Sequence, residues 1–442
     1  MKELKFPYPN IVKVLDQYYG VDTKSDTTFF KQGVKSILKE LVTRKKVNNA
    51  PLKKKSLSIL ITTFWDYPHT GGLSNYITAL RDGLRNLGHQ VDVIAPNQFP
   101  EEKVSKIRAQ IVPELKQFLN GRYGTYSSKV LQSMRLLFVY ENMLKYIDLE
   151  KYDILHAQDL FTANILGRLN EAHGKPLIYT PHGMFTYNRL KFNRIEKGSV
   201  EEVYYEEMER KAVDYASHII NITDSFIPQL RKLGASMKKM TTIHTGIEYP
   251  HSISIRKPHD KIVISCVARL GPRKGQQDLL LAIANLKNIT EDIDVLIIGD
   301  GDMREILEKQ VEDLRVKNVY FLGSRDDVPY LLSITDIFVL PTLNDSLPLS
   351  IIEAMHSGTA IISTYCGGIP ELIQHNETGI LINPGDVNEL TKQLEYLINS
   401  KTNRERLGNN AFAYAQKNLT LKEMLSRIEN KYYQLTYDEG GK

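Results

Sequence analysis

Short apolar runs alternate with amphipathic stretches from residue 56 to about residue 435. Apolar runs of strand length that alternate with helical stretches are typical of a parallel sheet covered by helices on both faces. Six such runs come before residue 248 and six after residue 259: 56–64, 89–96, 152–158, 175–183, 217–223 and 240–247, then 260–270, 293–302, 318–323, 336–342, 359–364 and 378–386. The pattern predicts an α/β protein with two Rossmann-like, doubly wound domains that face each other across a cleft.

A polar stretch with two prolines, residues 244–260, separates the two series and indicates the connection between the domains. The segment 97–150 is long and has a helical sequence pattern, which predicts an insertion in the first domain. The pattern over 421–435 predicts a C-terminal helix that is able to pack on either domain. The expected division is a basic N-terminal extension over 1–55, a first domain over 56–245, a linker over 246–259, a second domain over 260–420, and a C-terminal helix and tail over 421–442.

The composition is that of a globular protein of more than one domain, with 442 residues, 42% hydrophobic and 25% charged. No run of about 18 apolar residues is present, so no membrane-spanning helix is expected. The first ten residues lack the apolar core of a signal peptide. Cys266 and Cys366 are the only cysteines, which is too few for a disulfide framework. These features favour a cytoplasmic protein.

The excess positive charge is concentrated at the N-terminus. Residues 1–56 contain 13 Lys or Arg and 5 Asp or Glu, whereas the remainder contains 44 and 47. This distribution argues against a broad nucleic-acid-binding surface. Residues 29–47 place an apolar stripe at helical spacing among lysines. Two interpretations stay open: the helix contacts an anionic membrane surface through residues 29–55, at the inner membrane face, or it docks on the first domain, as most amphipathic helices of soluble proteins do.

The loop after the seventh apolar run carries two basic residues, Arg269 and Lys274. A nucleoside diphosphate leaving group carries about two negative charges, which a guanidinium and an ammonium group can neutralise without a metal ion. The alternative interpretation is an ordinary surface loop with solvated basic side chains.

A second candidate region is the segment 344–358. Asp345 or Ser346 is expected to cap a helix whose first turn begins at Pro348, leaving backbone amides for phosphate oxygens. Glu353 follows Asp345 by eight residues, or about two helical turns, so both carboxylates are expected near one edge. Its carboxylate can accept two hydrogen bonds from ribose hydroxyls. The alternative is a plain capping acid and an exposed helical glutamate.

Several ordered segments of the second half resemble the donor domain of glycosyltransferase family 4, which has the GT-B fold. They are VARLGPRKG, IGDGDMREILE, FLGSRDDVPYLLSITDIFVLPT, DSLPLSIIEAM and TYCGGIPELI. In the first half, TTFWDYPHTGGLSNYITALRDGLRNLGHQV is similar to the first strand, glycine loop and first helix of that family. The resemblance covers about residues 56–435. It implies that the first domain is the acceptor side and that the second domain binds the nucleotide-sugar donor.

This resemblance implies a retaining, metal-independent glycosyltransferase whose donor substrate is a nucleotide sugar and which uses no cofactor. A UDP-sugar is the favoured donor over a GDP-sugar. The resemblance places the diphosphate on Arg269 and Lys274 and the ribose on Glu353, and it places His182 beside the donor sugar. The implied catalytic residues are His182, Arg269, Lys274 and Asp345, and the implied donor-binding residues are Gly71, Gly72, Arg269, Lys274, Leu349 and Glu353. Asp345 stands where the family usually has glutamate, and this shorter acid is expected to alter sugar preference.

The triplet Asp300-Gly301-Asp302 matches a metal-binding pattern of another glycosyltransferase class. Because it closes an apolar run, a glycine turn at a strand end explains it without an ion, and no metal ligands are expected.

The acceptor is left open among a cell-envelope glycan, a lipid-linked glycan and a small molecule. The expected chemistry passes through an oxocarbenium-like state, with same-face internal return rather than a covalent double displacement. Two alternative functions fit the architecture: a nucleotide-sugar 2-epimerase and a non-catalytic nucleotide-sugar-binding protein. The first needs acid and base carboxylates in the first domain, which the sequence does not reveal. The second is expected to lose Arg269, Lys274 or Glu353, and all three are present.

Overall fold

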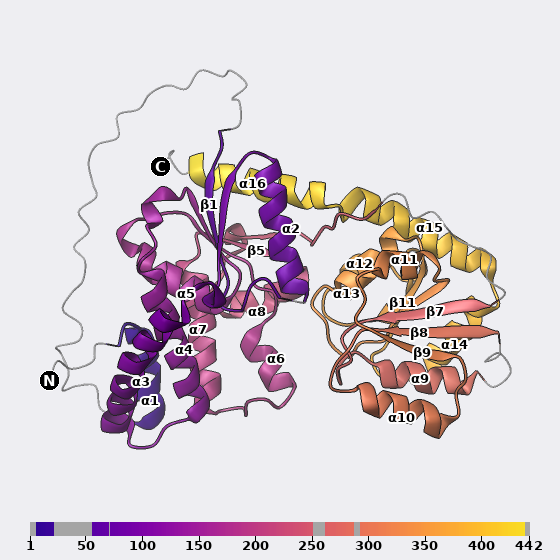
Figure 1. The fold of residues 1–442 in the computed structure, drawn as a ribbon, viewed down its shortest axis with the longest axis horizontal. Helices are drawn as coiled ribbons and strands as arrows, with labels where there is room; N and C mark the ends of the chain where they lie inside the picture. The colour runs from indigo at the N-terminus through magenta and orange to yellow at the C-terminus, as the bar shows by residue number, and fades with distance from the viewer. Residues whose placement is uncertain (1–5, 22–54, 70, 251–260, 287–291, 438–442) are drawn as a thin grey trace.

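The computed structural model describes residues 6–21, 55–69, 71–250, 261–286 and 292–437. Within them lie two six-stranded sheets, one in each half of the chain, and all strand pairs are parallel. Helices flank each sheet (Figure 1). Each of the twelve apolar runs contains one strand, so the predicted α/β class with two doubly wound domains is confirmed.

The sheet of the first domain has the order β2-β1-β3-β4-β5-β6. Its strands are β1 (Ser58–Thr62), β2 (Gln90–Ile94), β3 (Ile154–Ala157), β4 (Leu177–Tyr179), β5 (His218–Asn221) and β6 (Met240–Thr242). Its helices are α1 (Pro9–Tyr19), α2 (Gly72–Asn86), α3 (Glu101–Tyr123), α4 (Ser128–Leu144), α5 (Leu160–Leu169), α6 (Phe185–Lys191), α7 (Val200–Tyr215) and α8 (Ile227–Lys232). The β3 residues are all buried because helices cover both faces of a parallel sheet.

The sheet of the second domain has the order β12-β11-β10-β7-β8-β9. Its strands are β7 (Ile262–Val267), β8 (Ile293–Ile298), β9 (Val319–Gly323), β10 (Ile337–Leu340), β11 (Ala360–Thr364) and β12 (Ile380–Ile382). The helices are α9 (Gln276–Asn285), α10 (Arg304–Leu314), α11 (Val328–Ser333), α12 (Leu349–His356), α13 (Ile369–Leu372), α14 (Val387–Ile398) and α15 (Lys401–Asn418).

The described part of the N-terminal segment packs on the first domain. The side chains of Tyr8 and Ile11 are buried in its core, and α1 contacts α7. The carboxylate of Asp16 accepts two hydrogen bonds from Arg122 of α3, at 2.6 and 2.8 Å. The predicted amphipathic helix over 29–47 lies outside the described residues, so the choice between membrane contact and docking stays a prediction.

The C-terminal helix α16 (Leu421–Tyr437) returns from the second domain to the first and packs on α2 (Figure 1). Its Tyr432 hydroxyl lies 2.6 Å from His156 Nδ1, and both side chains are fully buried. The Glu429 carboxylate lies 3.1 Å from His89 Nε2. At the crossing, Ile247 exchanges backbone hydrogen bonds with residues 419 and 421. The sequence left the partner of this helix open, and the structure places it on the first domain.

Replacing Tyr432 by Phe should lower the thermal unfolding midpoint. The substitution keeps the ring and leaves the buried Nδ1 of His156 without its partner, which costs about 1–3 kcal/mol. Tyr437→Phe is the matched control, because this helix residue is 49% exposed, and its midpoint should stay at the wild-type value. Equal midpoints for the two variants would show that the contact between α16 and the first domain does not depend on this hydrogen bond.

Candidate functional site

The candidate site lies where the strand order of each sheet reverses. In the first sheet this point is between β1 and β3, and in the second it is between β7 and β10. Ligands of doubly wound sheets bind at the carboxyl ends of the strands that flank such a point. The loop after β1 carries Trp65 and Gly71, and the loop after β3 carries Gln158. The loop after β7 carries Arg269 and Lys274, and the loop after β10 carries Asp345.

The loop after β7 presents its two basic residues differently. Arg269 is exposed, whereas Lys274 is half-buried and its Nζ forms an ion pair with Asp345 Oδ2 from the loop after β10. Gly275, which follows, has a φ of +74°, and a Cβ there would lie 2.0 Å from the carbonyl oxygen of Pro341. Only glycine fits at this position. The close approach holds the two loops together and brings Lys274 to Asp345.

The segment before α12 differs from the expectation. Pro348 is the N-cap residue, and no side chain caps the helix. The Asp345 carboxylate instead accepts a hydrogen bond from the backbone amide of Ser346 and forms an ion pair with Lys274. The predicted capping by Asp345 or Ser346 is therefore wrong. The physical reason is Pro348, which disfavours helical geometry at Leu347 and so delays the start of the helix. The eight-residue spacing from Asp345 to Glu353 consequently does not correspond to two helical turns.

Glu353 lies in the middle of α12 and is half-buried. Burial raises the pKa of its carboxyl to about 7. Among the described residues, no hydrogen bond holds this carboxyl group. A ligand hydroxyl would therefore find an acceptor there that the fold has not already engaged, although the group is partly protonated near neutral pH.

His182 follows β4 and lies beside the first-domain helix α2. Its Nε2 is 3.0 Å from Gln158 Oε1, and its ring contacts that of Tyr76 at a centroid distance of 4.7 Å. An amide oxygen only accepts, so Nε2 carries the hydrogen and Nδ1 is left as the acceptor nitrogen. Burial lowers the pKa of His182 to about 4. The imidazole is therefore neutral at physiological pH and suited to accept a hydrogen bond from a hydroxyl group.

Several of the predicted residues meet across the domain boundary. A Cβ on Gly72 would lie 3.7 Å from Leu349 Cδ1, at the start of α12. The Ser346 hydroxyl lies 3.3 Å from the backbone oxygen of His182. Thus the glycine loop and His182 of the first domain face the Asp345 loop and α12 of the second. Arg269 makes no such contact among the described residues and stands exposed on its loop.

A contact that the sequence did not reveal joins the domains near this cleft. The Glu371 carboxylate accepts from Thr223 Oγ1 at 2.5 Å and from the backbone amides of Asp224 and Ser225 at 2.8 and 2.9 Å, and lies 2.9 Å from His244 Nε2. Burial acts to raise the pKa of Glu371, but the hydrogen bonds from His244, Thr223 and the two amides outweigh it and lower the pKa. The carboxylate is therefore ionised and fixes one domain against the other.

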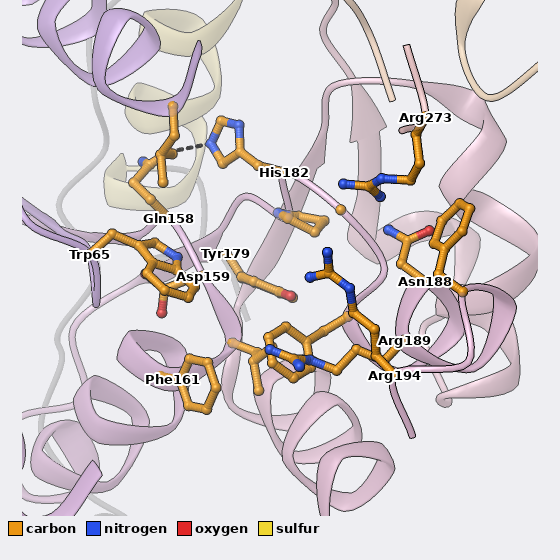
Figure 2. A pocket seen from close by; sticks show the side chains of 16 residues that line it. Trp65, Gln158, Asp159, Phe161, Tyr179, His182, Asn188, Arg189, Arg194 and Arg273 are labelled. Carbon is orange, nitrogen blue, oxygen red and sulfur yellow. Dashed lines mark hydrogen bonds between the residues drawn. The ribbon is translucent and has the colours of Figure 1, made fainter. Parts of the chain in front are cut away.

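A cavity of about 290 Å³ opens beside His182 (Figure 2). Three arginines line it, Arg189, Arg194 and Arg273, together with aromatic residues that include Trp65 and Phe161. Sequence reasoning missed this group. Arg273 lies between Arg269 and Lys274 in the sequence, where no pattern sets it apart, and the positions of Arg189 and Arg194 follow no recognisable motif.

The Asp300 carboxylate accepts a hydrogen bond from the Gly301 amide at 2.8 Å, within a turn in which Gly299 and Gly301 have positive φ. In the part of the chain that the structure describes, no group of three or more His, Cys, Asp or Glu residues is placed to bind a metal ion. None of the described helices is both long and apolar enough to cross a membrane.

Both halves of the chain match sequence models of glycosyltransferases. The model of Glycosyltransferase Family 4 matches residues 70–249, and that of Glycosyl transferases group 1 matches residues 251–414. An uncharacterized glycosyltransferase of Methanocaldococcus jannaschii is 25% identical over 373 residues, which cover 78% of this chain and 90% of the relative.

Another relative and one solved structure extend the comparison. The GalNAc-alpha-(1->4)-GalNAc-alpha-(1->3)-diNAcBac-PP-undecaprenol alpha-1,4-N-acetyl-D-galactosaminyltransferase of Campylobacter jejuni is 27% identical over 372 residues, 80% of this chain and 92% of the relative. The crystal structure of Anabaena Alr3699/HepE in complex with UDP-glucose shares the fold, with a TM-score of 0.61, 19% identity and coverage of 85% of this chain and 99% of that one. The chain therefore belongs to glycosyltransferase family 4, has the GT-B fold and is a glycosyltransferase.

Proposed function

We propose that this glycosyltransferase takes a sugar from a nucleoside diphosphate sugar and transfers it to an acceptor hydroxyl with retention of configuration and without a metal ion. The observation that carries the proposal is the position of the Lys274–Asp345 pair, on loops at the reversal point of the second sheet and opposite the first-domain glycine loop. A UDP-sugar is the favoured donor, and the shared fold with a protein that binds UDP-glucose supports this choice.

Charge balance favours the loop after β7 as the diphosphate site. Arg269 and Lys274 supply two positive charges, which match the about two negative charges of the diphosphate. In the structure Asp345 neutralises the Lys274 ammonium group, and donor phosphate oxygens would share or replace this contact. The arrangement lets side chains alone stabilise the charge that develops on the leaving group. Metal ligands are not required by this chemistry.

The proposed step breaks the bond between the sugar C1 and the diphosphate oxygen. The departing phosphate oxygen takes the proton of the acceptor hydroxyl, whose oxygen then bonds to C1 on the same face. Neutral His182 would position a sugar hydroxyl through its acceptor nitrogen. Asp345 would lie beside the transferred sugar, where its shorter side chain leaves more room than glutamate. Glu353 would accept hydrogen bonds from the ribose hydroxyls once its carboxyl group is ionised.

The substitutions Lys274→Ala and Arg269→Ala should each lower the turnover rate about a hundredfold or more, because each removes one positive charge that stabilises the leaving group. Donor cleavage can be measured with the nucleotide sugar that gives the largest thermal shift in a panel. Lys261→Ala is the matched control, since Lys261 forms a surface ion pair with Asp294 in the same domain. Wild-type turnover in folded Lys274→Ala and Arg269→Ala proteins would remove both residues from the diphosphate site.

Donor affinity should rise with pH because of Glu353. The unliganded carboxyl has a pKa raised to about 7, and hydrogen bonds from ribose hydroxyls favour its ionised form. As the pH falls from about 7 to about 6, donor binding must remove a proton from Glu353. The Kd for the donor should therefore increase by up to about tenfold over this range. Above about pH 8 the Kd should level off, because Glu353 is then already ionised.

Calorimetric titration with an intact nucleotide sugar measures this dependence, because its diphosphate does not change charge in that range. Glu353→Gln should bind the donor more weakly and show a flat profile. Glu312→Gln, which changes an exposed residue of α10, should keep the wild-type profile. If the Kd of Glu353→Gln depends on pH as strongly as that of the wild type, another group is responsible for the titration. Glu353 would then not be the residue that binds the ribose.

A further inference from the structure

The cavity beside His182 is built mainly by the first domain. The loop after β3 contributes Gln158 and Asp159, the loop after β4 contributes His182, and the segment that contains α6 and the following turn contributes Arg189 and Arg194. The second domain adds Arg273, from the loop that also carries Arg269 and Lys274. Neither Arg269 nor Lys274 lines the cavity. The cavity therefore adjoins the proposed donor site without including the residues assigned to the donor diphosphate.

Aromatic rings, not carboxylates, hold two of the three arginines. The Arg189 guanidinium lies 4.1 Å from the centroid of the Phe185 ring and 5.5 Å from that of Tyr205. The Arg273 guanidinium lies 4.7 Å from the centroid of Phe192. Across the described ranges, none of the three arginines forms an ion pair with an Asp or Glu side chain. Stacking on ring faces orients a guanidinium and leaves its N–H groups available to an anion.

The positive charge of Arg194 lies close enough to that of Arg273 to affect it. Burial lowers the pKa of Arg273, and the charges of Arg194 and Arg269 lower it further, while Asp345 acts in the opposite direction. One carboxylate, Asp159, lies in the cavity wall, but it already accepts hydrogen bonds from the amides of Phe64 and Thr162, at 2.6 and 2.8 Å. With three arginines and one carboxylate in its wall, the cavity carries an excess of positive charge.

Two further groups in the wall suit a hydroxylated ligand. Gln158 is almost fully buried, and its Nε2 donor has no hydrogen-bond partner among the described residues. A buried donor without a partner costs free energy that a ligand oxygen would recover. Trp65 lies on the cavity wall with 44% of its surface exposed, which offers a flat apolar face. Figure 2 shows Gln158 and Trp65 on one side of the cavity and Arg273 with Asn188 on the other.

We propose that this cavity is the acceptor subsite and that the acceptor carries a phosphate or diphosphate group, which Arg189, Arg194 and Arg273 bind. The inference rests on the proposed function, because it takes the adjoining cleft to hold the donor. A carboxylate carries one negative charge and is satisfied by a single bidentate arginine. Three arginines in one cavity match the about 1.5 to 2 negative charges of a phosphate monoester, or those of a diphosphate. The acceptor hydroxyl would then face His182 and the donor sugar.

The test uses the full chain saturated with UDP, so that the donor phosphate site is already filled. Inorganic phosphate and pyrophosphate are titrated at constant ionic strength, with acetate as the carboxylate comparison. Trp65 is the only tryptophan of the chain and lines the cavity, so its fluorescence reports binding there. We expect a saturable change with phosphate or pyrophosphate and a much weaker one with acetate.

The arginine variants connect this signal to the cavity. Arg189→Gln and Arg194→Gln should each weaken phosphate binding about tenfold or more, because each removes charge-assisted hydrogen bonds. Arg194 is exposed, so its replacement should not disturb folding. Arg108→Gln removes one half-exposed arginine from α3, outside the cavity, and should bind phosphate as the wild type does.

Each result separates the inference from the function on which it rests. UDP binding by calorimetry without saturable phosphate binding would overturn the phosphorylated acceptor and leave the donor assignment standing. Acetate that binds as tightly as phosphate, or Arg189→Gln and Arg194→Gln variants that behave like Arg108→Gln, would also overturn it. Failure of UDP and of all nucleotide sugars to bind would instead contradict the proposed function.

Discussion

The contact between the Glu371 carboxylate and the segment 223–225 fixes the relation of the two domains on which the rest of the site depends. Three hydrogen bonds from the first domain, together with the contact to His244, engage one ionised carboxylate of the second domain. Charge-assisted hydrogen bonds of this kind are stronger and more directional than neutral ones. Glu371 is half-buried at this junction, so removing its partners would leave a poorly solvated charge.

Two chain connections complete this arrangement. Ile247 exchanges backbone hydrogen bonds with residues 419 and 421 where the chain crosses between the domains in both directions. Beyond the second crossing, α16 anchors itself in the first domain through Glu429 and Tyr432. With the domains fixed in this way, Gly72 comes to face Leu349, and Ser346 contacts His182. The predicted site residues are far apart in the sequence, and these contacts assemble them.

Charge distribution divides the assembled region into two parts. On the donor side, Lys274 is paired with Asp345, and Arg269 is exposed to solvent. On the other side, the cavity beside His182 holds three arginines without a carboxylate partner in the described part of the chain. Burial keeps His182 neutral and Glu353 partly protonated near neutral pH. His182 therefore contributes a hydrogen bond, and Glu353 makes ligand binding depend on pH. The basic side chains supply the electrostatic attraction for anionic substrates.

The strands and the basic loop could be predicted because their signals are local. Buried parallel strands are continuous apolar runs, and Arg269 and Lys274 lie at the end of the seventh run and shortly after it in the sequence. The helix cap was predicted wrongly because Asp345 pairs with Lys274, 71 residues away, and Pro348 delays the helix. Glu371 meets Thr223 across 148 residues. Such pairings, like the gathering of Arg189, Arg194 and Arg273, follow from how the domains pack and leave no local pattern.

The most direct test of the account is proton NMR of donor cleavage in excess EDTA. Water can replace the unknown acceptor, and the anomeric signals of the freshly released sugar report its configuration before mutarotation. If side chains alone hold the diphosphate and the nucleophile enters on the face that the phosphate leaves, the reaction will proceed in EDTA and the first anomer formed will have the configuration of the donor. An inverted first anomer, or a reaction that starts only after manganese or magnesium is added, would contradict the account.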